Sequence, residues 1–314
     1  MIPVSRSRTL ALLGAAAVAQ PLAARAQTAT TKIRLGTSVS DSYGTAFYAI
    51  DGGFLGKAGI SADLTILPNG ERLVQAMAGN ALDVALADPI QVAHAINAGV
   101  PLVFIAGGGL YSTTAPATAL IVAKNSPLRQ PKDLEGTTVG VVGLASVSAL
   151  AVREWMRQSG IDLDKVKLVE VGFPEMAPAV VRGTVSAAFL GEPFLSSYRN
   201  DIRIFAKAYD AIGKQFYICA WFTTRDWLDK NPDVAKRLVT AAYDTARWSN
   251  AHHAETAAIL AKYNKMEVDK VQAMTRCVYA TSLEARLMQP MLDIAYKYKA
   301  LEKPVDANAI FARV

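Results

Sequence analysis

Short apolar segments alternate with segments of helical spacing from Lys32 to Ala206. The apolar runs predict strands at 32–38, 61–67, 84–87, 103–106, 138–142, 166–171, 187–190 and 202–206, with a further extended segment at 119–123. The segments between them predict helices at 46–52, 70–79, 89–98, 146–159, 175–182 and 193–198. Such alternation is typical of an α/β fold with largely parallel sheets.

The pattern changes at Thr224, after which it is almost purely helical. Thr224 is suited to cap a helix, and Pro232 is suited to the first turn of the next one. Alanine, leucine and aromatic residues then recur at helical spacing through Tyr298. The pattern therefore predicts a helical C-terminal part.

One segment of the chain is similar to a second segment about 100 residues later, and we call this pair of segments the echo. Residues 79–89 (GNALDVALADP) align without a gap on residues 183–193 (GTVSAAFLGEP). In both, a helix ends at glycine, a short apolar strand follows, and an acidic residue before proline opens the next helix. The echo predicts two similar lobes. Because ligands of open α/β sheets bind at the carboxyl ends of strands, Asp88 and Glu192 stand at candidate ligand-binding edges.

The first 26 residues have the features of a secretory signal. Arg6 and Arg8 precede an apolar run of 11 residues, and the segment 24–26 (ARA) fits the small-x-small rule for cleavage before Gln27. The run is too short to span a bilayer. The alternative is a buried N-terminal helix. We expect an exported protein that functions in the periplasm.

Composition narrows the class of protein. The 314 residues are 52% hydrophobic and 19% charged, which excludes a disordered chain and a small disulfide scaffold. The net charge of +6 includes three arginines of the first 26 residues, which contain no acid. The remaining surface is nearly balanced in charge and provides no electrostatic basis for binding nucleic acid.

The sequence contains no recognisable catalytic or metal motif. GxSxG, HExxH, Walker and CxxC patterns are absent. The adjacent His252 and His253 diverge on a helix, and His94 lies inside the helix after Asp88. Cys219 and Cys277 are expected to be buried free thiols, with a disulfide as the alternative. We therefore expect no enzyme activity, metal or cofactor.

The two acids of the echo are candidate ligand-binding residues. Asp88 fits equally well as a helix cap before Pro89. Glu192 is a poor cap, so a ligand role is favoured for it, with Phe194 close by. An ionised carboxylate only accepts hydrogen bonds. Two carboxylates facing one cleft therefore predict an amine, amidine or aminopyrimidine ligand.

A serine-rich helix start provides a second candidate. Ser146 and Ser148 follow the strand at 138–142 and begin the next helix. The free N–H groups and the dipole of a helix N-terminus attract anions or carbonyl oxygens. Ser146 is equally well explained as a plain N-cap.

Five short segments stand out by their order and spacing: 53–59 (GFLGKAG), 76–85 (AMAGNALDVA), 133–140 (DLEGTTVG), 191–194 (GEPF) and 303–307 (KPVDA). In these segments the chain resembles the periplasmic solute-binding proteins of ABC importers, and the resemblance covers residues 30–310. The nearest branch includes binders of nitrate, aliphatic sulfonates, taurine and thiamine-precursor pyrimidines.

This resemblance implies an α/β, two-lobe, type II periplasmic binding protein fold, in which each lobe is a mixed sheet flanked by helices. Lobe one is expected to combine 29–121 with 222–314, and lobe two to span 122–221, with a hinge of two strands near 119–123 and 218–223. Two sequential independent domains are the alternative. The resemblance also implies ligand contacts from the loop after the first strand and the following helix, at Ser40, Asp41, Tyr43 and Phe47.

The same resemblance implies what the protein binds. Its expected partners are a small-molecule solute and a membrane permease, and we expect a monomer. The expected solute bears an amine or is zwitterionic, such as taurine, an aliphatic sulfonate or an aminopyrimidine. The alternatives are an anion binder of the nitrate or bicarbonate type, a periplasmic sensor, and a fold-related enzyme of pyrimidine synthesis.

Overall fold

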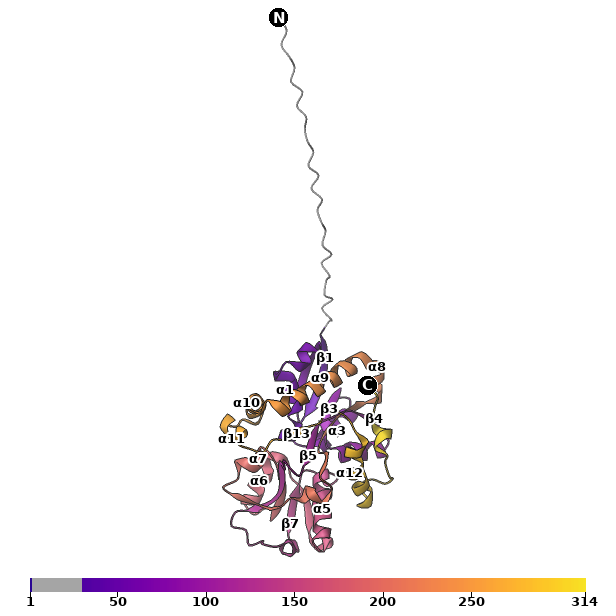
Figure 1. Cartoon of the computed structure of the whole chain (residues 1–314). Coiled ribbons are helices and arrows are strands. Elements are labelled where there is room, and N and C mark those ends of the chain that lie inside the picture. The colour runs from indigo at the N-terminus through magenta and orange to yellow at the C-terminus, as the bar shows by residue number, and fades with distance from the viewer. Residues whose placement is uncertain (2–29) are drawn as a thin grey trace.

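The computed structural model describes Met1 and residues 30–314. The signal peptide and the cleavage site before Gln27 lie outside the described residues. In Figure 1, one sheet with α1, α3 and α9 lies in the upper part of the molecule, and a second with α5, α6 and α7 lies below it. The alternating α/β pattern predicted from the sequence is present in both parts.

The first five-stranded sheet has the order β2-β1-β3-β12-β4. Its strands are β2 (Ile60–Ile66), β1 (Thr31–Thr37), β3 (Val84–Ala87), β12 (Ala220–Thr224) and β4 (Leu102–Gly107). Strands β1, β2 and β3 are parallel, whereas β12 is antiparallel to both of its neighbours. The sheet is therefore mixed, and β12 joins it from more than 100 residues further along the chain than β4.

The second sheet repeats this arrangement in the order β8-β7-β9-β6-β10. Its strands are β8 (Lys167–Glu170), β7 (Thr138–Val141), β9 (Ala187–Gly191), β6 (Thr118–Ala123) and β10 (Ile202–Ala206). Strand β7 is parallel to β8 and β9, and β6 is antiparallel to β9 and β10. The echoed strands β3 and β9 thus occupy equivalent central positions, as the repeated segment predicts.

Helices cover both sheets. Around the first are α1 (Thr45–Asp51), α2 (Phe54–Lys57), α3 (Gly70–Ala78), α4 (Pro89–Asn97), α8 (Arg225–Lys230), α9 (Pro232–Ala251), α10 (His253–Asn264), α11 (Val268–Gln272) and α12 (Ala285–Lys297). Around the second are α5 (Val147–Gln158), α6 (Phe173–Val181) and α7 (Phe194–Ser197). Short 3₁₀ turns are η1 (Asp41–Tyr43), η2 (Pro131–Leu134), η3 (Leu163–Lys165), η4 (Ala208–Ala211) and η5 (Ala307–Ile310). Thr224 caps α8 by accepting from the N–H of Trp227, as expected.

A third, three-stranded sheet joins the two halves. It consists of β11 (Gln215–Tyr217), β5 (Gly109–Ser112) and β13 (Val278–Tyr279). The sequence predicts no strand at 109–112 or 215–217 and an almost purely helical region from Thr224 to Tyr298, so this sheet corrects the prediction. All three strands are short, and their pairing partners lie far apart in the chain, so no local pattern marks them.

The segments that connect the two large sheets run through β5 and β11. The expected crossing strands near 119–123 and 218–223 correspond mainly to β6 and β12, and each of these strands pairs within a single large sheet. The expected lobe boundaries, at 121/122 and 221/222, therefore fall inside β6 and β12.

Among the residues that the structure describes, no helix is long and apolar enough to span a membrane.

Candidate functional site

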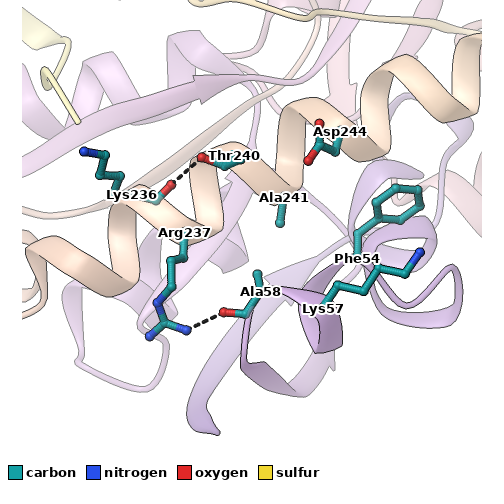
Figure 2. Close-up of a pocket in the computed structure, with 8 residues that line it drawn as sticks. All are labelled: Phe54, Lys57, Ala58, Lys236, Arg237, Thr240, Ala241 and Asp244. Atoms are coloured by element: carbon teal, nitrogen blue, oxygen red, sulfur yellow. Dashed lines mark hydrogen bonds between the residues drawn. The ribbon is translucent and has the colours of Figure 1, made fainter. Parts of the chain in front are cut away.

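A groove of about 750 Å³ lies on the outside of the first half, between α2 and α9 (Figure 2). Arg237 of α9 donates to the carbonyl oxygens of Ala58 and Gly59 and to the hydroxyl of Thr31. These contacts place the groove at the amino ends of β1 and β2. Ligands of open α/β sheets bind at the opposite, carboxyl ends, so this groove is not the first candidate site.

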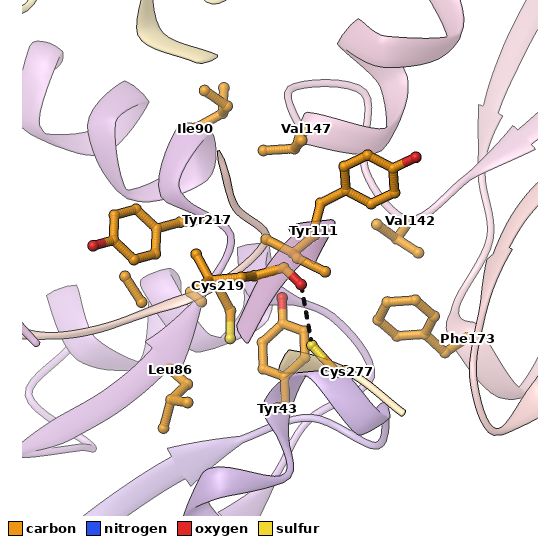
Figure 3. Packing of buried hydrophobic residues seen from close by; sticks show 14 of the residues in the cluster. Tyr43, Leu86, Ile90, Tyr111, Val142, Val147, Phe173, Tyr217, Cys219 and Cys277 are labelled. Atoms are coloured by element: carbon orange, nitrogen blue, oxygen red, sulfur yellow. Dashed lines mark hydrogen bonds between the residues drawn. The ribbon is translucent and has the colours of Figure 1, made fainter. Parts of the chain in front are cut away.

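The carboxyl ends of parallel strands of both sheets instead border a cavity of about 20 Å³. Twelve residues line it: Ser40, Ser42, Tyr43, Asp88, Thr118, Val142, Ser148, Phe173, Phe189, Gly191, Tyr209 and Ile218. Figure 3 shows Tyr43 and Cys277 on one side of this region and Val142 and Phe173 on the other. The volume is enough for about one water molecule, so a solute enters only if the two halves separate.

Four of the nine residues predicted to bind ligand line this cavity: Ser40, Tyr43, Asp88 and Ser148. The other five do not: Asp41, Phe47, Ser146, Glu192 and Phe194. Their side chains are engaged within the protein, each for a reason given below.

Asp88 bridges the two halves of the molecule. Its Oδ1 accepts from the N–H of Ile90 at 2.9 Å, which caps α4. Its Oδ2 accepts at 2.7 Å from the N–H of Val147, the first residue of α5 in the other half. Burial raises the pKa of Asp88 to about 7, although these N–H groups oppose the shift. Asp88 is thus both a helix cap and a wall of the cavity.

Glu192 has a different role from its counterpart in the echo. It is 4% exposed, and its carboxylate accepts from the N–H and the hydroxyl of Ser196, at 2.9 and 2.7 Å. Burial raises the pKa of Glu192 to about 7. Its backbone carbonyl accepts from the N–H of Asp41. The two acids therefore do not converge on one cavity, because the Glu192 side chain turns toward the short helix α7.

Ser146 is an N-cap. Its hydroxyl accepts from the N–H of Ala149 and donates to the carbonyl of Gly143 at 2.6 Å. It also lies 2.8 Å from the hydroxyl of Ser148, which reaches the cavity. Of the free N–H groups at this helix start, that of Val147 already binds Asp88.

Asp41 is buried in an ion pair rather than exposed to the cavity. It lies 3.1 Å from Arg276, and the side chains are 2% and 5% exposed. The hydroxyls of Tyr48 and Tyr279 and the N–H of Cys277 also donate to its carboxylate. This network fixes the loop whose neighbouring residues line the cavity.

The two predicted aromatic contacts pack elsewhere. Phe47 is fully buried and stacks on Tyr263 at 4.1 Å between ring centroids. Phe194 stacks parallel to Phe173 at 6.5 Å and so supports a ring that lines the cavity. Tyr43 meets the edge of Phe173 across the two halves at 6.4 Å. The aromatic walls therefore come from both halves.

Eight lining residues were missed by the sequence analysis: Ser42, Thr118, Val142, Phe173, Phe189, Gly191, Tyr209 and Ile218. The rule that ligands bind at strand ends could have found Val142, Phe173 and Gly191, which lie at or just after the ends of β7, β8 and β9. Tyr209 and Ile218 have no local signal, because only the packing of the two halves brings them there.

The cavity offers hydroxyls, aromatic rings and one carboxylate. Among the described residues that line it, none is Lys, Arg or His. Within residues 30–314, no group of three or more His, Cys, Asp or Glu is arranged to hold a metal ion. Cys219 and Cys277 do not line the cavity, and both are free and buried, as expected. Burial raises the pKa of both thiols.

The pKa shifts predict how stability varies with pH. Asp88 and Glu192 keep their protons up to about pH 7 in the folded state, whereas unfolded carboxyls ionise near pH 4. Unfolding therefore releases protons between these values, and stability falls as pH rises through this window. Glu154 acts oppositely: hydrogen bonds from Arg157 and other donors lower its pKa, so its contribution is lost only in acid.

We expect the melting temperature of the protein without added solute to be lower at pH 8 than at pH 5. The double variant Asp88→Asn, Glu192→Gln should show a flatter profile because neither side chain titrates. Differential scanning calorimetry checks both statements. A melting temperature that rises from pH 5 to pH 8 would contradict the assigned burial of the two acids.

Comparisons with known proteins agree with this architecture. The alkanesulfonate-binding protein SsuA from Xanthomonas axonopodis pv. citri superimposes with a TM-score of 0.77 at 17% identity, covering 91% of this chain and 99% of that one. Two matched halves, each a mixed sheet flanked by helices, with a cavity between them, define the type II periplasmic binding protein fold. The expected fold class is confirmed.

The sequence comparisons show the family. Residues 42–256 match the family model described as NMT1/THI5 like, and the chain belongs to that family. A formylaminopyrimidine-binding protein of Halalkalibacterium halodurans is 24% identical, over 70% of this chain and 73% of the relative. A taurine-binding periplasmic protein of Escherichia coli is also 24% identical, over 62% and 59%. The predicted resemblance to solute-binding proteins of ABC importers is confirmed.

Proposed function

We propose that this protein captures a small, nitrogen-containing solute in the periplasm and delivers it to the permease of an ABC importer. The cavity at the strand ends of both halves supports this role, because a solute held there contacts both lobes and stabilises their closed arrangement. We propose binding without catalysis, and action as a monomer. The lobes are proposed to divide in the connecting segments 113–117 and 218–219, next to β5 and β11.

The solute we propose is an amine-bearing ring such as an aminopyrimidine. The observation that carries this proposal is Asp88, a buried carboxylate on the cavity wall. Each of its oxygens has a second lone pair, so it can accept from a solute N–H while it caps α4. The rings of Tyr43 and Phe173 offer faces and edges to a planar solute, and the hydroxyls of Ser40 and Thr118 offer further hydrogen bonds.

A zwitterion such as taurine is the second candidate. Its amine would use Asp88, and its sulfonate would use the N-terminus of α5. The N–H of Val147 donates to the carboxylate of Asp88, which shows that this helix start attracts an anion, and a sulfonate can take the position only where Asp88 releases that N–H. We expect weaker binding of a simple anion such as nitrate or bicarbonate, since the described residues that line the cavity include no cationic side chain.

The pH dependence of affinity tests the proposal. A donor-bearing solute binds ionised Asp88, whereas an anion prefers the protonated, neutral form. For 2-aminopyrimidine, whose ring is neutral in this range, we expect affinity to rise about tenfold between pH 6 and pH 8, following the ionised fraction of a carboxyl whose pKa is about 7.

Isothermal titration calorimetry on 2-aminopyrimidine, taurine, an alkanesulfonate and nitrate measures this dependence. An affinity that falls with pH, or binding of nitrate alone, would replace the amine proposal by the anion alternative.

A further inference from the structure

A second cavity of about 260 Å³ lies mainly on the first half of the molecule, with one residue of the second half at its edge. It is lined by Glu71, Val74 and Gln75 of α3, by Gln91, His94 and Ala95 of α4, and by Ala145 of the loop before α5. Asp88, on the wall of the first cavity, precedes Gln91 by three residues. Val147, whose N–H donates to Asp88, is two residues after Ala145 in the chain. The Asp88–Val147 contact is thus close in the chain to residues that line both cavities.

Gln91 supplies an unusual group to the second cavity. The residue is 4% exposed, and neither its Nε2 nor its Oε1 has a hydrogen-bond partner among the described residues. A buried amide without partners is costly, so native proteins rarely keep one. Its donor and acceptor are suited to a group that presents the complementary pair.

Two glycines make room for this amide. A Cβ atom on Gly70 would lie 2.1 Å from Oε1 of Gln91, and one on Gly143 would lie 2.6 Å from its Nε2. Gly70 belongs to α3 of the first half, whereas Gly143 follows β7 of the second. The Gln91 amide therefore occupies a narrow space between the two halves, here called the seam. A larger residue in place of either glycine would fill it.

The charges around the seam select against an anion. Glu71 lines the cavity, and Glu170 of the other half lies close to Glu71. The side-chain amide of Asn69 donates to the carboxylate of Glu170 at 2.9 Å. Burial and the neighbouring Glu170 raise the pKa of Glu71. His94 directs its Nδ1 to the carbonyl oxygen of Ala300 at 2.8 Å. A neutral donor–acceptor group fits these surroundings better than a carboxylate or sulfonate.

We propose that the second cavity is an extension of the solute site, in which the amide of Gln91 pairs with a carboxamide-like group on the solute. This inference rests on the proposed function, since the ring of the same solute lies against Asp88. Separation of Asp88 from Val147 on solute entry joins the two cavities into one elongated site. Gln91 then determines specificity at the end of the site that Asp88 does not reach.

Three probes that share one ring test the proposal: 2-aminopyrimidine, its 5-carboxamide and its 5-carboxylate. Titration calorimetry should show the carboxamide binding about fivefold more tightly than the parent ring, and the carboxylate more weakly. Gln91→Met keeps the shape and removes the amide. It should abolish the preference for the carboxamide, so that the carboxamide and the parent ring bind with equal affinity. Gln272→Met, at an exposed position on α11, is the matched control and should behave as the wild type.

Two results would overturn the second subsite: a wild type that does not distinguish the carboxamide from the parent ring, and a preference that survives in Gln91→Met. Failure of all three probes to bind would instead refute the proposed aminopyrimidine. Acetamide, which presents the carboxamide alone, then tests Gln91. An increase in the melting temperature of the wild type that is smaller in Gln91→Met supports the subsite, and an equal increase or none overturns it.

Discussion

Arg276→Met is expected to destabilise the protein by about 3–5 kcal/mol, the usual cost of leaving a buried charge without its partner. Arg276 and Asp41 are almost completely buried, and they share their hydrogen bonds with Tyr48. Without the guanidinium, the Asp41 carboxylate keeps only neutral donors in a site closed to water. Urea denaturation followed by circular dichroism measures the loss.

Lys262→Met is the matched control. Lys262 pairs with Asp51 at 2.7 Å, but its side chain is 64% exposed, so the expected cost is below about 1 kcal/mol. The double variant Asp41→Asn, Arg276→Met should recover part of the stability lost in Arg276→Met, because no charge is then stranded. A loss in Arg276→Met no larger than that in Lys262→Met would contradict a structural role for the pair.

Asp88→Asn is expected to weaken binding of 2-aminopyrimidine about 10- to 100-fold. A hydrogen bond to a charged group contributes roughly 1.5–3 kcal/mol, and about 1.4 kcal/mol corresponds to a factor of ten. Asparagine still caps a helix, so α4 should persist, and at pH 5, where Asp88 is protonated, the melting temperature should change little. The pH dependence of affinity should disappear with the titrating carboxyl. Titration calorimetry at pH 6 and pH 8 measures both effects.

The variant Glu192→Gln distinguishes the role of Glu192 in binding from that of Asp88. Convergence of both acids on the solute would make this variant as damaging as Asp88→Asn. Because the Glu192 side chain is bound to Ser196 and does not line the cavity, we expect an effect below about threefold, less than one neutral hydrogen bond. Tighter binding of an anion by Asp88→Asn would instead favour the anion alternative.

Much of the fold follows from local patterns. Strand β3 and the start of α4 lie where the apolar run and the Asp-Pro pair predict them, because four consecutive buried residues and a side-chain cap are local features. The equivalence of β3 and β9 was visible in the internal echo. The third sheet was not, since β5, β11 and β13 each find their partners across a long sequence separation.

The sequence by itself determined the α/β class, the repeated strand-to-helix element and the chemical types available at the strand ends. Only the tertiary structure decided which of these groups line the cavity. Asp41 and Glu192 have the same carboxylate chemistry as Asp88, but Arg276 and Ser196 engage their side chains, while Asp88 lies on the cavity wall. The physical reason is that a side chain's role depends on the partners that surround it, and here those partners come from remote parts of the chain.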